Sequence, residues 1–351
     1  MNPSPEIIDA QFSSKPSASP SRPHRVGINV ALFILTFLSA VTSQVLPRLE
    51  TQNFHDALLL VWHRPQVLAT GLPFAVTLMA ILLAHEMGHY LTARRYGVDQ
   101  SLPYFIPAPT LFGTFGAVIL MRSQPPNRGA LLNVAVAGPF AGLLLAVPAA
   151  AWGLAHSVPI NPGEIPPGSI WFGSSLLFHV LEQAFSPNGT NVELHAVGLA
   201  GWVGLFITSL NLIPAAQLDG GHVAYALLGA RQRRLARVVI VALVFLGLYQ
   251  GSGGGTVWLV WAVLLVFLGL RHPPARNEAA TLTRGQKVAG WLALLIFVLT
   301  FIPAPITITG QDSAPQQMEQ PEPRRHPHRQ APEPYRPSPQ QNSQGPKEYQ
   351  L

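Results

Sequence analysis

The segment LLAHEMGHYLTARR, residues 82–95, decides how this chain is interpreted. It ends an uncharged apolar run, residues 66–84, and then brings two histidines and a glutamate together: His85, Glu86 and His89. A bilayer span needs about 20 mostly apolar residues, so the run is long enough to cross a membrane. Ionisable side chains within such a span are unfavourable and indicate a function. The segment therefore predicts a membrane helix that carries a chemical site.

The composition of the whole chain also indicates a membrane protein. Of its 351 residues, 48% are hydrophobic and 11% are charged, whereas soluble domains carry about 25% charged residues. We expect an all-α polytopic membrane protein with about six to eight transmembrane helices. Cysteine is missing, which excludes disulfides and cysteine-ligated metals. The uncharged runs cover residues 28–46, 66–84, 131–163, 194–218, 238–270 and 288–310.

The basic residues predict an orientation in the membrane. Four arginines lie in residues 94–128 and four in residues 231–237, whereas residues 156–193 contain no Lys or Arg. The positive-inside rule places the first two segments in the cytoplasm and the third outside. Because the basic residues sit in short loops between spans, the net charge of +6 is a topology signal. We expect the lipid bilayer as a partner and no nucleic acid.

The chain divides into three expected regions. Residues 1–26 form a polar N-terminal tail without the character of a transit peptide, which favours a bacterial plasma (inner) membrane. Residues 27–303 form the membrane domain. Residues 304–351 are rich in Pro and Gln, and we expect a disordered tail because such a segment buries little apolar area. The tail would lie outside if the last span crosses fully; the sequence does not define an oligomeric state.

The spacing of His85 and His89 predicts a metal site. Residues four apart lie on one face of a helix, so both imidazoles can reach one Zn²⁺. Glu86 would lie beside the zinc-activated water and take its proton as general base. The alternative is a helix end with two interfacial histidines, which the apolar setting of the motif argues against.

A catalytic zinc usually has three protein ligands, so a third must come from elsewhere. The metzincin continuation does not follow His89, and the next glutamate, Glu164, lies in the outer loop. Asp219 directly adjoins a long apolar run, in the stretch NLIPAAQLDGGH at residues 211–222. By the topology above it lies at the cytoplasmic membrane edge, level with the two histidines. Asp219 is therefore the expected third ligand.

The two motifs together resemble the site-2 protease family of intramembrane zinc metalloproteases. HEMGH at residues 85–89 and NLIPAAQLDGGH at residues 211–222 are most similar to the branch that includes the plastid yellow-green proteases and their bacterial relatives. The segments FGTFGA, residues 112–117, and AGPFAG, residues 137–142, look like further family segments. The resemblance covers about residues 75–230. Many bacterial members insert a PDZ domain, for which the outer loop is too short.

The resemblance implies a function and roles for residues. Zn²⁺ would be bound by His85, His89 and Asp219, with Glu86 as base, and the Asn211 amide would hold the substrate or the developing oxyanion. The alternative for Asn211 is a capping or interhelical hydrogen bond. The implied activity is hydrolysis of peptide bonds within or near transmembrane segments of membrane-protein substrates.

Residues 103–121 combine Pro, Gly and β-branched residues without a helical pattern. Irregular backbone at membrane depth is tolerated when it is buried in protein or lines a cavity. We expect a short re-entrant β-hairpin near the active site, which could offer a strand edge to an unwound substrate. Its candidate substrate-binding residues are Gly113, Thr114, Phe115 and Gly116. The alternative is a plain surface loop.

The remaining features have structural readings or count against other functions. We expect His222 to support the site or the fold without ligating the metal, and His195 to lie at the opposite membrane edge. Gly138 and Gly142 have the spacing of close helix packing. Membrane zincins with a downstream Glu-x-x-x-Asp helix are not matched. The alternative functions are a catalytically inactive membrane scaffold or a metal-transporting bundle, although transporters tend to show repeats and none is visible.

Overall fold

The computed structural model describes residues 26–49, 53–160, 165, 168–186, 191–251, 254–269, 275–277 and 279–308. Nearly all of the expected N-terminal tail, and the expected C-terminal tail from residue 309 onward, lie outside the described residues. The described chain is mostly helical, as predicted. Its helices are α1 (Val26–Val45), α2 (Phe54–His63), α3 (Leu72–Arg95), α4 (Arg128–Ala155), α5 (Leu176–Phe185), α6 (Ala196–Asn211), α7 (Asp219–Leu228), α8 (Gln232–Gln250), α9 (Thr256–Phe267) and α10 (Arg284–Thr300).

Three helical segments in the described part of the chain are long and apolar enough to cross a membrane. They are Val26–Val45, Pro65–Arg95, in which a 3₁₀ segment precedes α3, and Arg128–Ala155. Shorter apolar helices follow, at Leu176–Phe185, Ala196–Asn211 and Thr256–Phe267. Large aliphatic side chains on the outer surfaces of these helices are exposed, which fits a lipid environment.

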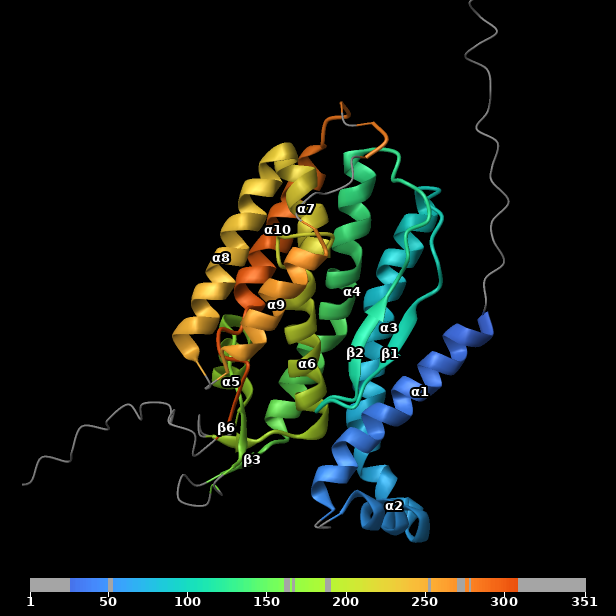
Figure 1. The fold of residues 1–351 in the computed structure, drawn as a ribbon, viewed down its shortest axis with the longest axis vertical. Coiled ribbons are helices and arrows are strands. Elements are labelled where there is room, and N and C mark those ends of the chain that lie inside the picture. Colours follow the sequence, from blue (N-terminus) through green and yellow to red (C-terminus); the bar gives the residue numbers. More distant parts are fainter. Residues whose placement is uncertain are drawn as a thin grey trace, which may run out of the picture. The chain divides into compact units, whose positions relative to one another are not determined.

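Helices α3, α4 and α6 pack against one another and form the centre of the fold (Figure 1). Glycines allow the backbones to approach closely. A Cβ at Gly88 of α3 would meet the backbone carbonyl of Ala137 in α4, and Gly153 of α4 lies against Gly198 of α6. Small residues at helix crossings are typical of membrane bundles. The apolar core around them includes Trp202 of α6, which is fully buried.

The expected hairpin is present. Strand β1 (Tyr104–Pro107) pairs with β2 (Thr114–Val118) in antiparallel fashion, with a register shift between Phe105 and Pro107. The segment is therefore not an unpaired loop, and its re-entry into the membrane stays a prediction. Figure 1 shows the hairpin between α1 and α4, with β1 on the side of α1.

Two further small sheets are present in the described residues. Strand β3 (Val158–Pro159) pairs with β5 (Val192–Glu193), and β4 (Ile170–Phe172) pairs with β6 (Ile306–Ile308). Residues 304–308, at the start of the expected disordered tail, thus hold a strand. The pairing joins β6 to the loop of residues 156–193, and the crossing of the membrane by α10 stays a prediction.

Candidate metal centre

Helix α3 carries the first half of the site. His85, Glu86 and His89 are buried, with 4%, 5% and 9% of their surfaces exposed. Burial of three ionisable groups is unfavourable unless they are partnered or bind a metal. Because α3 is continuous through the motif, the i, i+4 spacing brings the two imidazoles to one face.

The segment between α6 and α7 supplies the third side chain. After Asn211 ends α6, a short irregular stretch leads to Asp219, the first residue of α7. A carboxylate in the first turn of a helix is favoured by the helix dipole. Gly220 lets α7 start directly against the preceding turn, because a Cβ there would meet the backbone of Leu212 and Ile213. The turn includes Ala216 at φ 53°, in the left-handed region.

Three potential ligand atoms form a nearly equilateral triangle. His85 Nε2 and His89 Nε2 are 3.1 Å apart, and Asp219 Oδ2 lies 3.3 Å and 3.2 Å from them. In a tetrahedral zinc site with bonds of about 2 Å, the ligand atoms are separated by about 3.3 Å. The described residues contain one cluster of this kind. The geometry and the two-nitrogen, one-oxygen donor set therefore fit Zn²⁺.

The hydrogen bond on the far side of the His89 ring sets its tautomer. His89 Nδ1 lies 2.8 Å from the backbone carbonyl oxygen of Val134. Since a carbonyl only accepts, Nδ1 carries the proton, and Nε2 presents its lone pair to the triangle. This is the arrangement that a zinc-ligating histidine needs.

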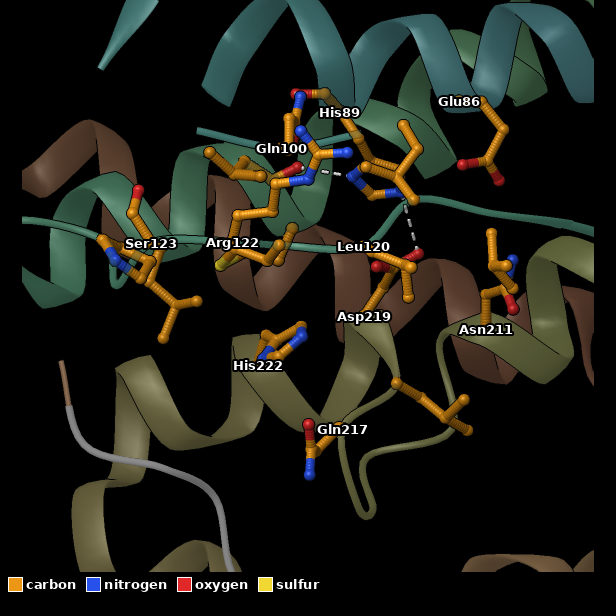
Figure 2. A pocket seen from close by; sticks show the side chains of 18 of the residues that line it. Glu86, His89, Gln100, Leu120, Arg122, Ser123, Asn211, Gln217, Asp219 and His222 are labelled. Carbon is orange, nitrogen blue, oxygen red and sulfur yellow. Dashed lines mark hydrogen bonds and ion pairs between the residues drawn. The ribbon is translucent and has the colours of Figure 1, made fainter. Parts of the chain in front are cut away.

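Glu86 and Asn211 lie on the same side of the His89–Asp219 pair (Figure 2). The Asn211 amide nitrogen is 3.3 Å from His85 Nε2. A carboxylate and an amide thus flank the triangle in one cavity, where a base and a hydrogen-bond donor could act on the same peptide group.

The cavity has a volume of about 520 Å³. One wall is the continuation of β2, because residues 117–124 line it together with the triangle, Glu86 and Asn211. The expected substrate-binding residues Gly113, Thr114, Phe115 and Gly116 are not among the described lining residues. They form the turn end of the hairpin, where Phe115 is 72% exposed. Their role stays a prediction.

Several lining residues carry no sequence signal for this location. Gln100 is buried, donates to the His89 carbonyl at 3.3 Å and bridges to Met121 across the hairpin. Gln217 and Arg122 also line the cavity. The sequence could not place Gln100, because its position depends on the pairing with Met121.

The other two histidines and the two glycines singled out in the sequence lie at or near the cavity, except His195. His222 lines the cavity outside the triangle. His195 caps α6 by accepting from the Val197 amide, apart from the site. Gly138 faces the His89 ring and Gly142 faces His85, so both serve close packing around the site.

Fold and site together define a polytopic helical protein with a His-Glu-x-x-His helix and an aspartate from a second helix. Residues 73–249 match peptidase family M50. The chain belongs to this family.

Similar curated proteins are plant proteins. The chain is 35% identical over 243 residues to the probable zinc metalloprotease EGY1, chloroplastic, of Arabidopsis thaliana. The aligned region covers 66% of this chain and 43% of that protein. It is 30% identical over 288 residues to the probable zinc metalloprotease EGY2, chloroplastic, of the same plant, covering 81% and 49%. The chain thus spans about half the length of these relatives. No solved structure matches.

Proposed function

We propose that this protein is an intramembrane zinc metalloprotease that hydrolyses peptide bonds within or near transmembrane segments of other membrane proteins. The observation that carries the proposal is the triangle of His85, His89 and Asp219 with sides of 3.1 to 3.3 Å, buried beside Glu86 in an apolar bundle. Membership of peptidase family M50 supports the same reaction.

His85, His89 and Asp219 would hold the metal. Zinc bound there would supply Lewis acidity, which polarises the scissile carbonyl and makes a water molecule acidic. Glu86 then accepts the proton of that water and delivers it to the leaving amine. Asn211 donates its amide hydrogen to the developing oxyanion. Burial in the bundle excludes bulk water and strengthens these interactions.

A transmembrane substrate helix must unwind before its peptide bond can react, and its backbone groups then need partners. The hairpin offers them. Arg122 donates its amide to Asp99 at 2.8 Å, and Ser101 donates to Leu120 at 3.0 Å. Met121, between these bonds, directs its own N–H and C=O to the opposite edge. Residues 117–121 line the cavity, so a substrate strand paired there would lie beside the metal. Of the expected residues Gly113, Thr114, Phe115 and Gly116, the exposed Phe115 would contact the substrate farther along the hairpin, whereas Gly113 packs against α1.

We place the protein in a bacterial plasma membrane as a multi-pass protein with six to eight spans and the metal centre towards the cytoplasmic side. The arginines at the end of α3, in the segment before α4 and at the start of α8 support this orientation. Fusions of a reporter to the loop before α4 and to the loop of residues 156–193 would report opposite sides of the membrane.

The experiment that tests the activity compares wild-type protein with Glu86→Gln, both purified and zinc-loaded, on a panel of single-span peptides. Wild type is expected to cut and Glu86→Gln to bind zinc without cutting. Equal cutting by both would refute Glu86 as base. Zinc transport into vesicles without any cutting would favour the metal-transporting bundle, and a lack of both activities would favour the inactive scaffold.

A further inference from the structure

Helix α1 lies outside the residues that match the family, yet it contacts the hairpin along its length. One face of α1 is buried and the opposite faces are exposed and apolar. Of the six buried residues of α1, Asn29, Thr36, Ala40 and Gln44 are spaced by seven, four and four residues, which is a single helical stripe; the other two are Val41 and Val45. Two of these four side chains are amides, which is unusual for a helix whose other faces suit lipid.

The amides and one hydroxyl of α1 donate hydrogen bonds to the backbone of the hairpin region. Asn29 Nδ2 lies 2.8 Å from the Pro103 carbonyl and 3.2 Å from the Leu102 carbonyl. Ser39 Oγ donates to the Ala108 carbonyl at 3.1 Å, and Gln44 Nε2 to that of Leu111 at 3.2 Å. The donors thus reach the residues just before β1 and two positions in the turn between β1 and β2.

Steric contact fixes the same interface. Gly113, at the turn, has φ +73°, and a Cβ there would lie 2.5 Å from the backbone nitrogen and Cα of Ala40. The hairpin turn is therefore seated directly on the backbone of α1. At membrane depth, carbonyls without a donor are strongly unfavourable, so the donors of α1 give the hairpin a defined place.

We propose that α1 is a positioning helix, whose Asn29, Ser39 and Gln44 fasten the outer side of the hairpin so that its opposite edge, residues 117–121, faces the metal centre. The described hydrogen bonds of these residues to the hairpin do not involve the metal ligands. They act through the hairpin. The inference rests on the proposed protease function, because the positioned edge is the one that would pair with substrate.

The test uses a double variant, Asn29→Leu with Gln44→Leu, which keeps side-chain size and removes two donors. The matched control is Thr42→Val on the same helix, since the Thr42 hydroxyl bonds only to the Leu38 and Ser39 carbonyls of its own helix in the described contacts. We expect the double variant to keep its bound zinc and lose at least about tenfold in kcat/KM, mainly through KM. The control is expected to match wild type, and Asn29→Gln, which retains an amide, is expected to recover part of the loss.

A second measurement reads the interface without cleavage. The chain has no cysteine, so a pair made by Ser39→Cys and Ala108→Cys can be oxidised cleanly. The yield of this disulfide is expected to fall in the double variant and not in the control. Because Ser39→Cys removes one of the donors, the reduced pair is expected to lose part of its cleavage, and closing the disulfide, which links α1 to the hairpin covalently, is expected to recover it.

The outcomes distinguish failure of the positioning role of α1 from failure of the proposed protease function. Unchanged kcat/KM and disulfide yield in the double variant would overturn the positioning role, as would loss of cleavage when the disulfide closes. Loss of zinc together with cleavage would also overturn it, because the defect would then be in the metal centre. If wild type cuts no peptide, the proposed function fails, while the disulfide yields still decide whether α1 positions the hairpin.

Discussion

The packing of α4 against α3 makes a sharp prediction about the metal centre. Gly138 of α4 lies against the imidazole of His89, and the three atoms nearest to a Cβ built there all belong to that ring. The perturbation is Gly138→Ala, which adds one methyl group against the side of the His89 ring that carries the ligating Nε2. Gly142, one turn later on α4, faces the other histidine and provides the comparison.

The size of the effect follows from the distances. A methyl at Gly138 would lie 2.5 Å from Cε1 of His89 and closer to Nε2, whereas ordinary contact begins at 3.4 Å. The ring must therefore move by about 0.9 Å or more, and zinc–ligand distances tolerate only about 0.2 Å. At Gly142 the nearest atoms of His85 are 3.3 Å away, so a shift of about 0.1 Å is sufficient.

We expect Gly138→Ala to weaken zinc binding by at least the 10–100-fold that loss of an outer-shell partner causes, or about 1.4–2.7 kcal/mol. Gly142→Ala should change it by less than about threefold. The assay is competition of the purified protein with a zinc chelator of known affinity, with circular dichroism to confirm that both variants retain their helices.

Equal zinc affinities for the two variants would refute the reasoning, because the His89 ring could then not be confined between α3 and α4 as described. A large loss of helix in Gly138→Ala would also refute the reasoning, because the methyl group would then displace α4 and not the His89 ring.

Three further predictions follow from single contacts and from the metal. Arg128→Ala removes a guanidinium that donates to the carbonyls of Tyr225 and Ala226 at the end of α7. We expect the free energy of unfolding to fall by about 1–3 kcal/mol and zinc binding to weaken, with Arg128→Lys intermediate. An unchanged melting temperature and zinc affinity would contradict this. Ala216→Gly should raise the melting temperature slightly and Ala216→Val should lower it. The reason is that a backbone φ of 53° raises the free energy of a residue with a Cβ by about 1–2 kcal/mol. The reverse order of melting temperatures would exclude strain at this turn. Removal of the metal with a chelator should abolish peptide cleavage, and added zinc should restore it. The circular dichroism should change little, because α3, α4 and α6 pack through apolar contacts. Cleavage that survives metal removal would exclude a metal mechanism.

The metal centre was readable from the sequence because its evidence is local. His85 and His89 share a helix, so their juxtaposition follows from the helical period alone. Asp219 was reached because it is an aspartate beside a long apolar run, and the structure brings it within 3.3 Å of both histidines. The glycines that face the ring were predicted as packing residues from their spacing.

The walls of the cavity were not readable because they depend on register. Gln100 meets the His89 carbonyl only because it pairs opposite Met121, and the shift between Phe105 and Pro107 could not be seen in the sequence. Such a shift moves side chains to the other face of a strand. The hairpin residues that line the cavity begin at Ala117, whereas the sequence pointed to residues 113–116, whose role stays a prediction.

Long-range contacts were also beyond the sequence. The strand Ile306–Ile308 pairs with Ile170–Phe172, although each is too short to show a pattern. Nothing in the sequence singles out the amides of α1, and only the fold shows that they reach the hairpin.

The central claim is that zinc held by His85, His89 and Asp219, with Glu86 as base, cuts a peptide bond inside the bilayer. Its most direct test is mass-spectrometric mapping of the cut in a single-span substrate reconstituted with the enzyme in liposomes. We predict a cut within the span by wild type, and no cut by Glu86→Gln at equal zinc content. A cut confined to the soluble flanks of the substrate, or the same cut by Glu86→Gln, would contradict the account.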